Sequence, residues 1–131
     1  MKTKIGTFIS LLLLFGFLTT VLISCTKKED TPDYATAIAG TYTGTLTVVG
    51  TGSATASSTL SKSTDTIVDL LVTIGTSYTS LSGITVSYPS SNTYTLSYTD
   101  ASGSFTGTVQ GNKLSWTINA GSSVDTFTGT K

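Results

Sequence analysis

From Gly40 to the C terminus, apolar residues alternate with threonine and serine, and this period of two limits what the chain can fold into. Successive side chains of a β-strand point to opposite faces of a sheet, whereas a helix needs apolar residues three or four apart. The alternation therefore predicts strands with one buried face and one face of hydroxyl side chains. The apolar sets of the seven predicted strands are Tyr42/Leu46/Val48, Val68/Leu70/Val72/Ile74, Ile84/Val86/Tyr88, Tyr94/Leu96/Tyr98, Phe105/Val109, Leu114/Trp116/Ile118 and a last set containing Phe127.

One turn fixes the register of a hairpin near the C terminus. Residues 111–112 are Gly-Asn, which is typical of a two-residue hairpin turn because glycine adopts positive φ without strain. Closing the chain there pairs Val109 with Leu114 and Gly107 with Trp116, so that both pairs lie on the buried face. The indole opposite a strand glycine is also a known way of covering that glycine.

Two longer loops extend this hairpin into an antiparallel meander. The apolar positions face one another if a four-residue loop spans 100–103 and a five-residue loop spans 89–93. The resulting pairs are Tyr98 with Phe105, Leu96 with Gly107, Tyr88 with Tyr94 and Val86 with Leu96. Three successive hairpins with consistent facing predict an up-and-down sheet.

Two segments lack clear alternation and are predicted to be connections. The segment from Gly50 to Thr64 contains few large apolar residues, and we expect a long flexible loop with at most a short strand near Leu60. A second, shorter irregular stretch contains Tyr78 and Leu81. Loops as long as the first are usually functional or disordered.

A repeated aromatic-Thr-Gly-Thr motif indicates how the sheet closes. It occurs at 42–45, 105–108 and 127–130, and a glycine two residues after an inward aromatic permits the strong coiling that a small closed barrel requires. The fold class predicted is thus all-β, an antiparallel meander closing into a small barrel. A β-sandwich is the alternative, but sandwiches usually need Greek-key crossings, which the meander does not have.

The N-terminal segment, residues 1–24, has the pattern of a lipoprotein signal peptide. Lys2 and Lys4 precede an apolar run from 8 to 18, and Leu22, Ile23 and Ser24 lead directly to Cys25, the only cysteine. This pattern predicts lipidation of Cys25 and membrane attachment through the lipid. The alternative, an uncleaved transmembrane anchor, is disfavoured because threonines interrupt the run and its uninterrupted part is short.

Residues 25–35 are predicted to be a flexible tether between the lipid and a domain at 36–131. The acidic residue after the cysteine that typically retains lipoproteins in the inner membrane is absent, which favours the outer membrane. Lys28, Glu29 and Asp30 resemble a short charged tract that directs some lipoproteins to the cell surface. An ordinary solvated linker has a similar composition.

Composition excludes several classes of function. The chain has no histidine or arginine and its one cysteine is assigned to lipid, so catalytic triads, Cys–His dyads and zinc sites are unavailable. Nucleic-acid binding needs clustered Lys and Arg, which the chain lacks. Asp65 and Asp69 are the two acidic residues of the domain closest in sequence, and we expect them to face solvent. No catalytic residue, metal ligand or cofactor site is predicted.

The opening Gly40-Thr41-Tyr42 and the closing segment 127–131, together with the meander, resemble the calycin group of lipocalins and avidin-like barrels. The resemblance covers about 39–131 and is to the small lipocalin-like domains of bacterial lipoproteins. Many calycins pack a late arginine over the first aromatic. Here Tyr42 stands where many have tryptophan, and Lys131 or Lys113 would be poor substitutes for the arginine.

The resemblance implies a binding module that holds a small apolar or amphipathic ligand, although fold alone does not confer this. Aromatic side chains could line the mouth of the barrel, or they could fill its interior instead. These residues are Tyr42, Tyr88, Tyr94, Tyr98, Phe105 and Trp116. The alternative is an interaction lipoprotein, which acts through its outer surface as an accessory to an outer-membrane complex or as a host-facing adhesin. An enzyme is the least supported class.

Overall fold

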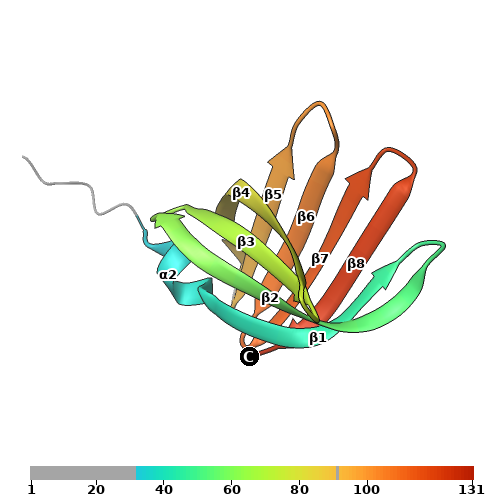
Figure 1. Ribbon diagram of the computed structural model, residues 1–131. Helices are drawn as coiled ribbons and strands as arrows, with labels where there is room; N and C mark the ends of the chain where they lie inside the picture. The colour runs from blue at the N-terminus through green and yellow to red at the C-terminus, as the bar shows by residue number, and fades with distance from the viewer. Residues whose placement is uncertain (1–31, 91) are drawn as a thin grey trace, which may run out of the picture. The chain divides into compact units, whose positions relative to one another are not determined.

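The alternating segments form antiparallel strands that each pair with the next, and the last strand pairs with the first to close a barrel (Figure 1). The computed structural model describes residues 32–90 and 92–131. The elements are α2 (Tyr34–Ile38), β1 (Gly40–Val48), β2 (Gly52–Thr64), β3 (Ile67–Ile74), β4 (Ser77–Ser90), β5 (Thr93–Thr99), β6 (Ser104–Gln110), β7 (Lys113–Ala120) and β8 (Ser123–Thr130). The predicted barrel is confirmed, and the sandwich alternative is wrong.

Glycines allow the strands to approach closely where the barrel closes. Gly44 of β1 faces Gly129 of β8, and a Cβ atom at Gly44 would collide with the carbonyl oxygen of Thr128. Gly107 faces Trp116, and a Cβ atom there would lie 3.0 Å from the Cβ atom of Trp116. A side chain would therefore collide with its neighbours at Gly44 and at Gly129, where the nearest atom lies 2.5 Å away, and would be crowded at Gly107.

The hairpin registers predicted for the C-terminal half are confirmed. Val109 pairs with Leu114 and Gly107 with Trp116, around the turn at 111–112. The four-residue loop at 100–103 is also present, and its pairs with Tyr98 and Leu96 are as predicted.

Residues 52–64, predicted to be mainly a flexible connection, form the strand β2, and the prediction is wrong. The inward positions of β2 include Ala56, Ser58 and Leu60, all buried. Two of these three side chains are too small to produce an apolar pattern. They are small because the indole of Trp116, from the far side of the barrel, lies against this strand and bonds to Ser58.

The stretch containing Tyr78 and Leu81 is also regular, because β4 begins at Ser77 and pairs with β3 from Ser77 to Thr85. A β-bulge interrupts the alternation between Leu81 and Ile84. Gly83 has a φ of +81° there, and its N–H donates to Asp69 Oδ1 at 3.0 Å. The bulge shifts the inward parity, which hid this strand from the period-two pattern.

The turn between β4 and β5 is shorter than the predicted five-residue loop. β4 continues to Ser90, which pairs with Thr93, and Asn92 adopts a φ of +61°. Val86 pairs with Leu96 as predicted. Tyr88 and Tyr94, predicted as partners, lie where the register shifts between Ser87 and Ser90, and their rings are 4.8 Å apart.

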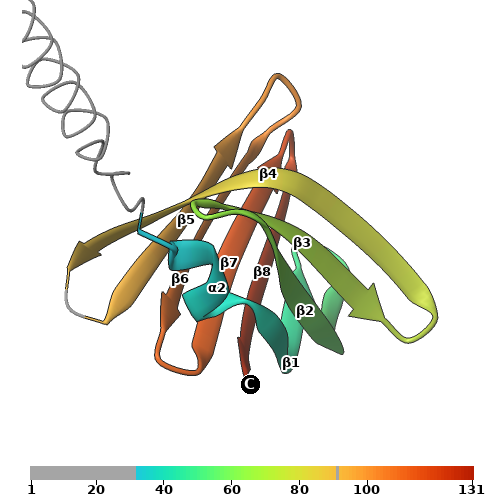
Figure 2. The same ribbon diagram turned by 90° about the vertical axis from the view of Figure 1, so that its left-hand side faces the viewer.

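The two ends of the barrel differ. At one, which we call the α2 end, helix α2 packs Ala35 and Ile38 against the core, and both are fully buried. Tyr34 and Ala35, assigned above to the tether, therefore belong to the folded unit. At the other, which we call the open end, the hairpin tips diverge, and the β5–β6 tip lies far from the β3–β4 tip in both views (Figures 1 and 2). In the described part of the chain, no helix has the length and apolarity for a membrane crossing.

Candidate functional site

The middle of the barrel is filled by aromatic side chains. Phe105, Trp116 and Phe127 are 1%, 4% and 2% exposed, and the Trp116 ring lies 5.6 Å from that of Phe127 and 6.0 Å from that of Phe105. The indole Nε1–H donates to Ser58 Oγ at 3.0 Å, and Ser58 is fully buried. Trp116, one of the predicted lining residues, is thus part of the core.

Tyr42, a second predicted lining residue, is fully buried near the α2 end. Its hydroxyl donates to the carbonyl of Ile38 at 2.8 Å, and burial raises the pKa of the phenol. The Nζ atom of Lys131 lies 5.2 Å from the ring centroid and donates to the carbonyl of Ala39 at 3.2 Å. The expectation that Lys131 would substitute poorly for an arginine is wrong in one respect: the lysine reaches both the ring and a backbone acceptor of the helix–strand junction.

Tyr88 and Tyr94 form an aromatic cluster with Tyr34 of α2. The rings of Tyr88 and Tyr94 lie 4.8 Å apart, and each is about 6 Å from Tyr34. Tyr88 is 41% exposed, and its hydroxyl accepts from the N–H of Asn92 at 2.8 Å. These two predicted lining residues therefore cover the α2 end and do not line a mouth.

A pocket of about 80 Å³ lies at the open end, and the remaining two predicted residues line it. Tyr98 and Phe105 contribute from β5 and β6, Leu81 from β4, and Ile118 from β7. Pockets for small molecules usually measure about 300–1,000 Å³. The space therefore suits one short side chain or a small part of a ligand.

The loop at 100–103 forms a rigid rim for this pocket. Asp100 accepts hydrogen bonds from the backbone and hydroxyl of Ser102, from the N–H of Gly103 and from the Tyr98 hydroxyl. These bonds, chiefly that from the Ser102 hydroxyl, lower the pKa of Asp100 from 3.8 to about 2. The hydrogen bond from the Tyr98 hydroxyl to Asp100 raises the pKa of the Tyr98 phenol. Sequence reasoning missed Leu81 and Asp100, although the Asp-x-Ser-Gly order is typical of such a turn.

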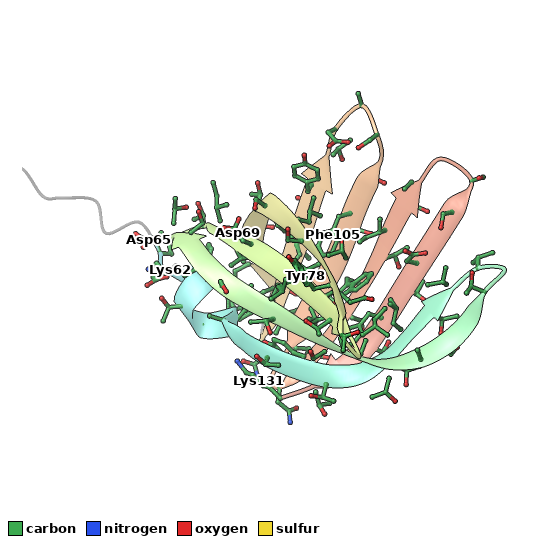
Figure 3. All side chains as sticks on the ribbon, in the orientation of Figure 1. Lys62, Asp65, Asp69, Tyr78, Phe105 and Lys131 are labelled. Carbon is green, nitrogen blue, oxygen red and sulfur yellow. The ribbon has the colours of Figure 1, made fainter. Side chains whose placement is uncertain are left out.

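Charge is distributed unevenly between the two ends. Asp100 and Asp125 lie at the open end, in the β5–β6 loop and near the start of β8. The lysines of the described chain lie at the α2 end: Lys113 is at the start of β7, and Figure 3 shows Lys62 near the end of β2 and Lys131 after β8. Lys62 bridges Asp33 Oδ2 at 2.6 Å and Asp65 Oδ1 at 2.7 Å. The open end is therefore acidic.

The outer face of β5–β8 forms a wide, shallow groove of about 570 Å³, lined by the outward hydroxyl side chains and by the backbone between them. The strand registers align these side chains in two rows that continue over β1 and β2. One row is Thr95, Thr108, Ser115, Thr128, Thr45 and Thr55; the other is Ser97, Thr106, Thr117, Thr126, Thr47 and Ser53. The predicted threonine face is thus present as an uncharged surface of hydroxyl side chains and their methyl groups.

The predicted lipidation and sorting residues lie outside the described residues. These are the cleavage motif Leu22, Ile23 and Ser24, the lipidated Cys25, and the tract Lys28, Glu29 and Asp30. Within the described chain, acidic side chains do not gather in groups of three that could hold a metal ion. Asp65 bonds to Lys62 and Asp69 to the backbone of Gly83, as structural contacts on the surface.

Comparisons with known proteins bear on the fold alone. No family model and no curated protein matches the sequence. One similar solved structure is the crystal structure of a "putative outer membrane protein" from Bacteroides fragilis, with a TM-score of 0.56 and 17% sequence identity. The match covers 77% of this chain and 54% of that chain, so this chain spans about half the length of that protein. At this identity the similarity supports the barrel fold.

Proposed function

We propose that the chain is a non-catalytic, lipid-anchored protein of the outer membrane that contacts another protein through the open end of a lipocalin-like barrel. The observation that carries this proposal is the filled interior. Trp116, Phe105 and Phe127 occupy the space in which a lipocalin-like barrel would hold a ligand, which leaves the rim as the accessible surface.

The lipocalin-like assignment is supported by the closed meander and by the position of Lys131 over Tyr42. A cation over the first aromatic of the barrel is the arrangement that the calycin resemblance implies. The similarity to a protein described as an outer membrane protein is consistent with the same location for this chain.

The polarity of the barrel supports attachment by lipid. The rows of threonine and serine face outward, while most apolar side chains of the described strands face inward, and the exposed ones, such as Leu71 and Tyr78, form no continuous band. A barrel that spans a membrane has the opposite arrangement, with an apolar band outside. Cys25, at the end of the apolar N-terminal run, supplies the attachment in this proposal. The tether precedes α2 in the chain, so it joins the barrel at the α2 end. The open end is then the end without the lipid attachment.

The residues of the described chain also support a non-catalytic role. The pocket at the open end contains Asp100 as its acidic group, and four hydrogen bonds from its own loop and from Tyr98 hold that carboxylate. A general base must have an oxygen within hydrogen-bond reach of the proton that it removes from the substrate. The oxygens of Asp100 are already occupied by these four donors.

The test places a photocrosslinking amino acid at Tyr78, near the open end and 75% exposed, or at Lys113, exposed at the α2 end. Intact cells are irradiated, and adducts of the lipoprotein are separated by mass. We expect a discrete protein adduct from Tyr78 and none of that mass from Lys113. The same adducts from both positions, or none from either, would contradict the proposal.

Exposure at the cell surface is the finer proposal for the location. If residues 28–30 direct export, added protease should degrade the protein on intact cells, and Lys28→Ala/Glu29→Ala/Asp30→Ala should protect it without changing lipidation. A wild-type protein that is protected in intact cells faces the periplasm. That result would remove the host-facing adhesin and leave a periplasmic accessory protein.

A second candidate function is the binding of a small apolar or amphipathic molecule at the mouth. The pocket between Leu81, Tyr98 and Ile118 favours it, because all three side chains are half-buried and apolar along most of their length. Native mass spectrometry of the protein extracted from its own membrane provides the test. A mass equal to the lipidated chain alone is expected under the main proposal, and a stoichiometric small adduct would favour this candidate.

A further inference from the structure

We propose that the free edge of β4, together with the pocket at the open end, binds an extended segment of a partner protein as an added β-strand. This inference rests on the proposed contact with a protein at the open end and names its site and chemistry. The occupant is a peptide in which an apolar residue fills the pocket and basic residues lie near Asp100 and Asp125.

The edge arises because β4 is much longer than its neighbour β5. β4 runs from Ser77 to Ser90, and its pairing with β5 covers only Thr85 to Ser90. Among the described strands, residues 77–84 pair with β3 on one side and with no strand on the other. Figure 2 shows β4 continuing past β5 toward the β3–β4 turn. Alternate N–H and C=O groups of this stretch are therefore available to another strand.

The edge lacks the usual protection against pairing. Natural edge strands are blocked by lysine, proline, inward charges or bulges. Residues 77–84 contain no charged residue and no proline. The bulge at Gly83 is at the end of this stretch, which leaves Ser77 to Leu81 as regular strand. Tyr78 is 75% exposed on it.

The pocket lies where an added strand would place a side chain. Leu81 belongs to the free stretch of β4, and it lines the pocket with Tyr98 of β5 and Ile118 of β7. In strand addition, main-chain hydrogen bonds give affinity and pockets for alternate side chains give specificity. A volume of about 80 Å³ is that of two to three waters, which fits one short aliphatic side chain.

Charge complementarity identifies the rest of the segment. Asp100 and Asp125 lie on this end, while the lysines of the described chain lie at the α2 end. Asp125 pairs in register with Ile118, which lines the pocket. A peptide with lysine or arginine beside its apolar residue would be attracted here. A second copy of this chain would bring the same two carboxylates, so it is the less favourable occupant.

The test uses synthetic peptides and the full chain in detergent solution. Four fluorescein-labelled ten-residue peptides alternate Ala, Val, Leu or Phe with lysine and threonine, and binding is followed by fluorescence anisotropy. The peptide that binds most tightly is then made in two N-methylated forms. In each form, methyl groups replace the N–H hydrogens along one of the two edges of the peptide strand. Because an added strand uses one edge, we expect one form to lose at least about tenfold in affinity and the other less than about twofold.

Charge is tested with matched variants. Asp125→Asn at the open end should weaken binding about two- to fivefold, and Asp65→Asn, the same change at the α2 end, should not change it. Circular dichroism verifies that each variant is folded. Peptides with aspartate in place of lysine should bind more weakly than the parent.

Several results would overturn the inference. The first is that none of the four peptides shows saturable binding. The second is that both N-methylated forms lose the same affinity, and the third is a dimer in sedimentation equilibrium that the peptides do not dissociate. The last result would assign the edge to a second copy. If the adduct from Tyr78 persists while the peptides fail, contact at the open end stands and strand addition does not. If the adduct is also absent, the proposed function fails.

Discussion

Trp116 connects the two halves of the barrel, and its substitution gives the largest effect that we predict on stability. Its ring packs between Phe105 and Phe127, and its N–H bonds to Ser58 on a strand that is 58 residues away in sequence. Trp116→Ala removes these contacts and uncovers Gly107. Loss of a buried Phe or Trp side chain typically costs about 3–5 kcal/mol, out of about 5–15 kcal/mol for a domain.

The hydrogen bond can be separated from the packing by two smaller changes. Trp116→Phe keeps an aromatic ring and removes the donor to Ser58, while Ser58→Ala leaves the indole N–H buried without an acceptor. Each is expected to lower the free energy of unfolding by about 1–3 kcal/mol, since an unpaired buried polar group retains its desolvation penalty. The double variant removes both partners, so its loss should be smaller than the sum by about 0.5–1.5 kcal/mol.

The assay is urea unfolding of the full chain, followed by circular dichroism because the single tryptophan is the residue being changed. With a slope of about 1–3 kcal/mol per molar urea, these losses move the midpoint by several tenths of a molar or more. An unchanged midpoint in Trp116→Ala would show that the side chain is not in the core. Additive losses in the double variant would refute the bond to Ser58.

Three further predictions concern other parts of the chain. Radiolabelled palmitate should enter the wild-type protein and not Cys25→Ala, which should remain an uncleaved precursor; equal labelling of both would remove the lipoprotein hypothesis. Gly44→Ala should lower the free energy of unfolding by about 1–3 kcal/mol in the same urea assay, because its methyl group meets a carbonyl across the β1–β8 seam. The outward Thr45→Ala is its control and should stay within about 0.5 kcal/mol. In an NMR titration, the carboxyl of Asp33, whose pKa is lowered from 3.8 to about 2 chiefly by the hydrogen bond from Lys62, should move back toward 3.8 in Lys62→Met. Because the pKa of Asp33 is lower in the folded than in the unfolded state, this contact stabilises α2 above about pH 4 and is lost as the pH falls toward 2. A titration midpoint near 3.8 for Asp33 in the wild-type protein would exclude the contact.

The C-terminal hairpins could be predicted from the sequence because local features determine them. The Gly-Asn turn at 111–112 and the spacing of large apolar residues allow only one register that keeps Trp116 and Phe105 on the same face. The glycines of the repeated motif were predicted to permit the coiling of a closed barrel, and two of them, Gly44 and Gly129, lie opposite each other where β1 meets β8.

The strand β2 could not be predicted because the size of its inward residues depends on residues that are distant in the sequence. Ala56 and Ser58 are small since Trp116 occupies the space above them, and period-two patterns depend on large apolar side chains. The first half of β4 was missed because the bulge at Gly83 shifts its parity, and the bulge is held by Asp69 from the neighbouring strand.

The candidate site was predicted only in part. Tyr98 and Phe105 line the pocket at the open end, but Tyr42 and Trp116 are core residues, and Tyr88 covers the other end. A pocket is the difference between the volume that strands enclose and the volume that side chains fill. That difference depends on all strands together. An aromatic residue on an inward face therefore does not reveal whether it lines a pocket or fills the core.

The indole proton of Trp116 reports on whether the barrel is filled by its own side chains. The chain has one tryptophan, so a ¹⁵N-labelled sample gives a single indole resonance, and its hydrogen exchange can be followed directly. If the interior is filled and the bond to Ser58 is present, this proton should exchange as slowly as the amides of the central strands, and added apolar compounds should not shift it. Exchange as fast as that of free indole in the folded protein, together with a shift on addition of such compounds, would show an open cavity and contradict a protein that works through its rim.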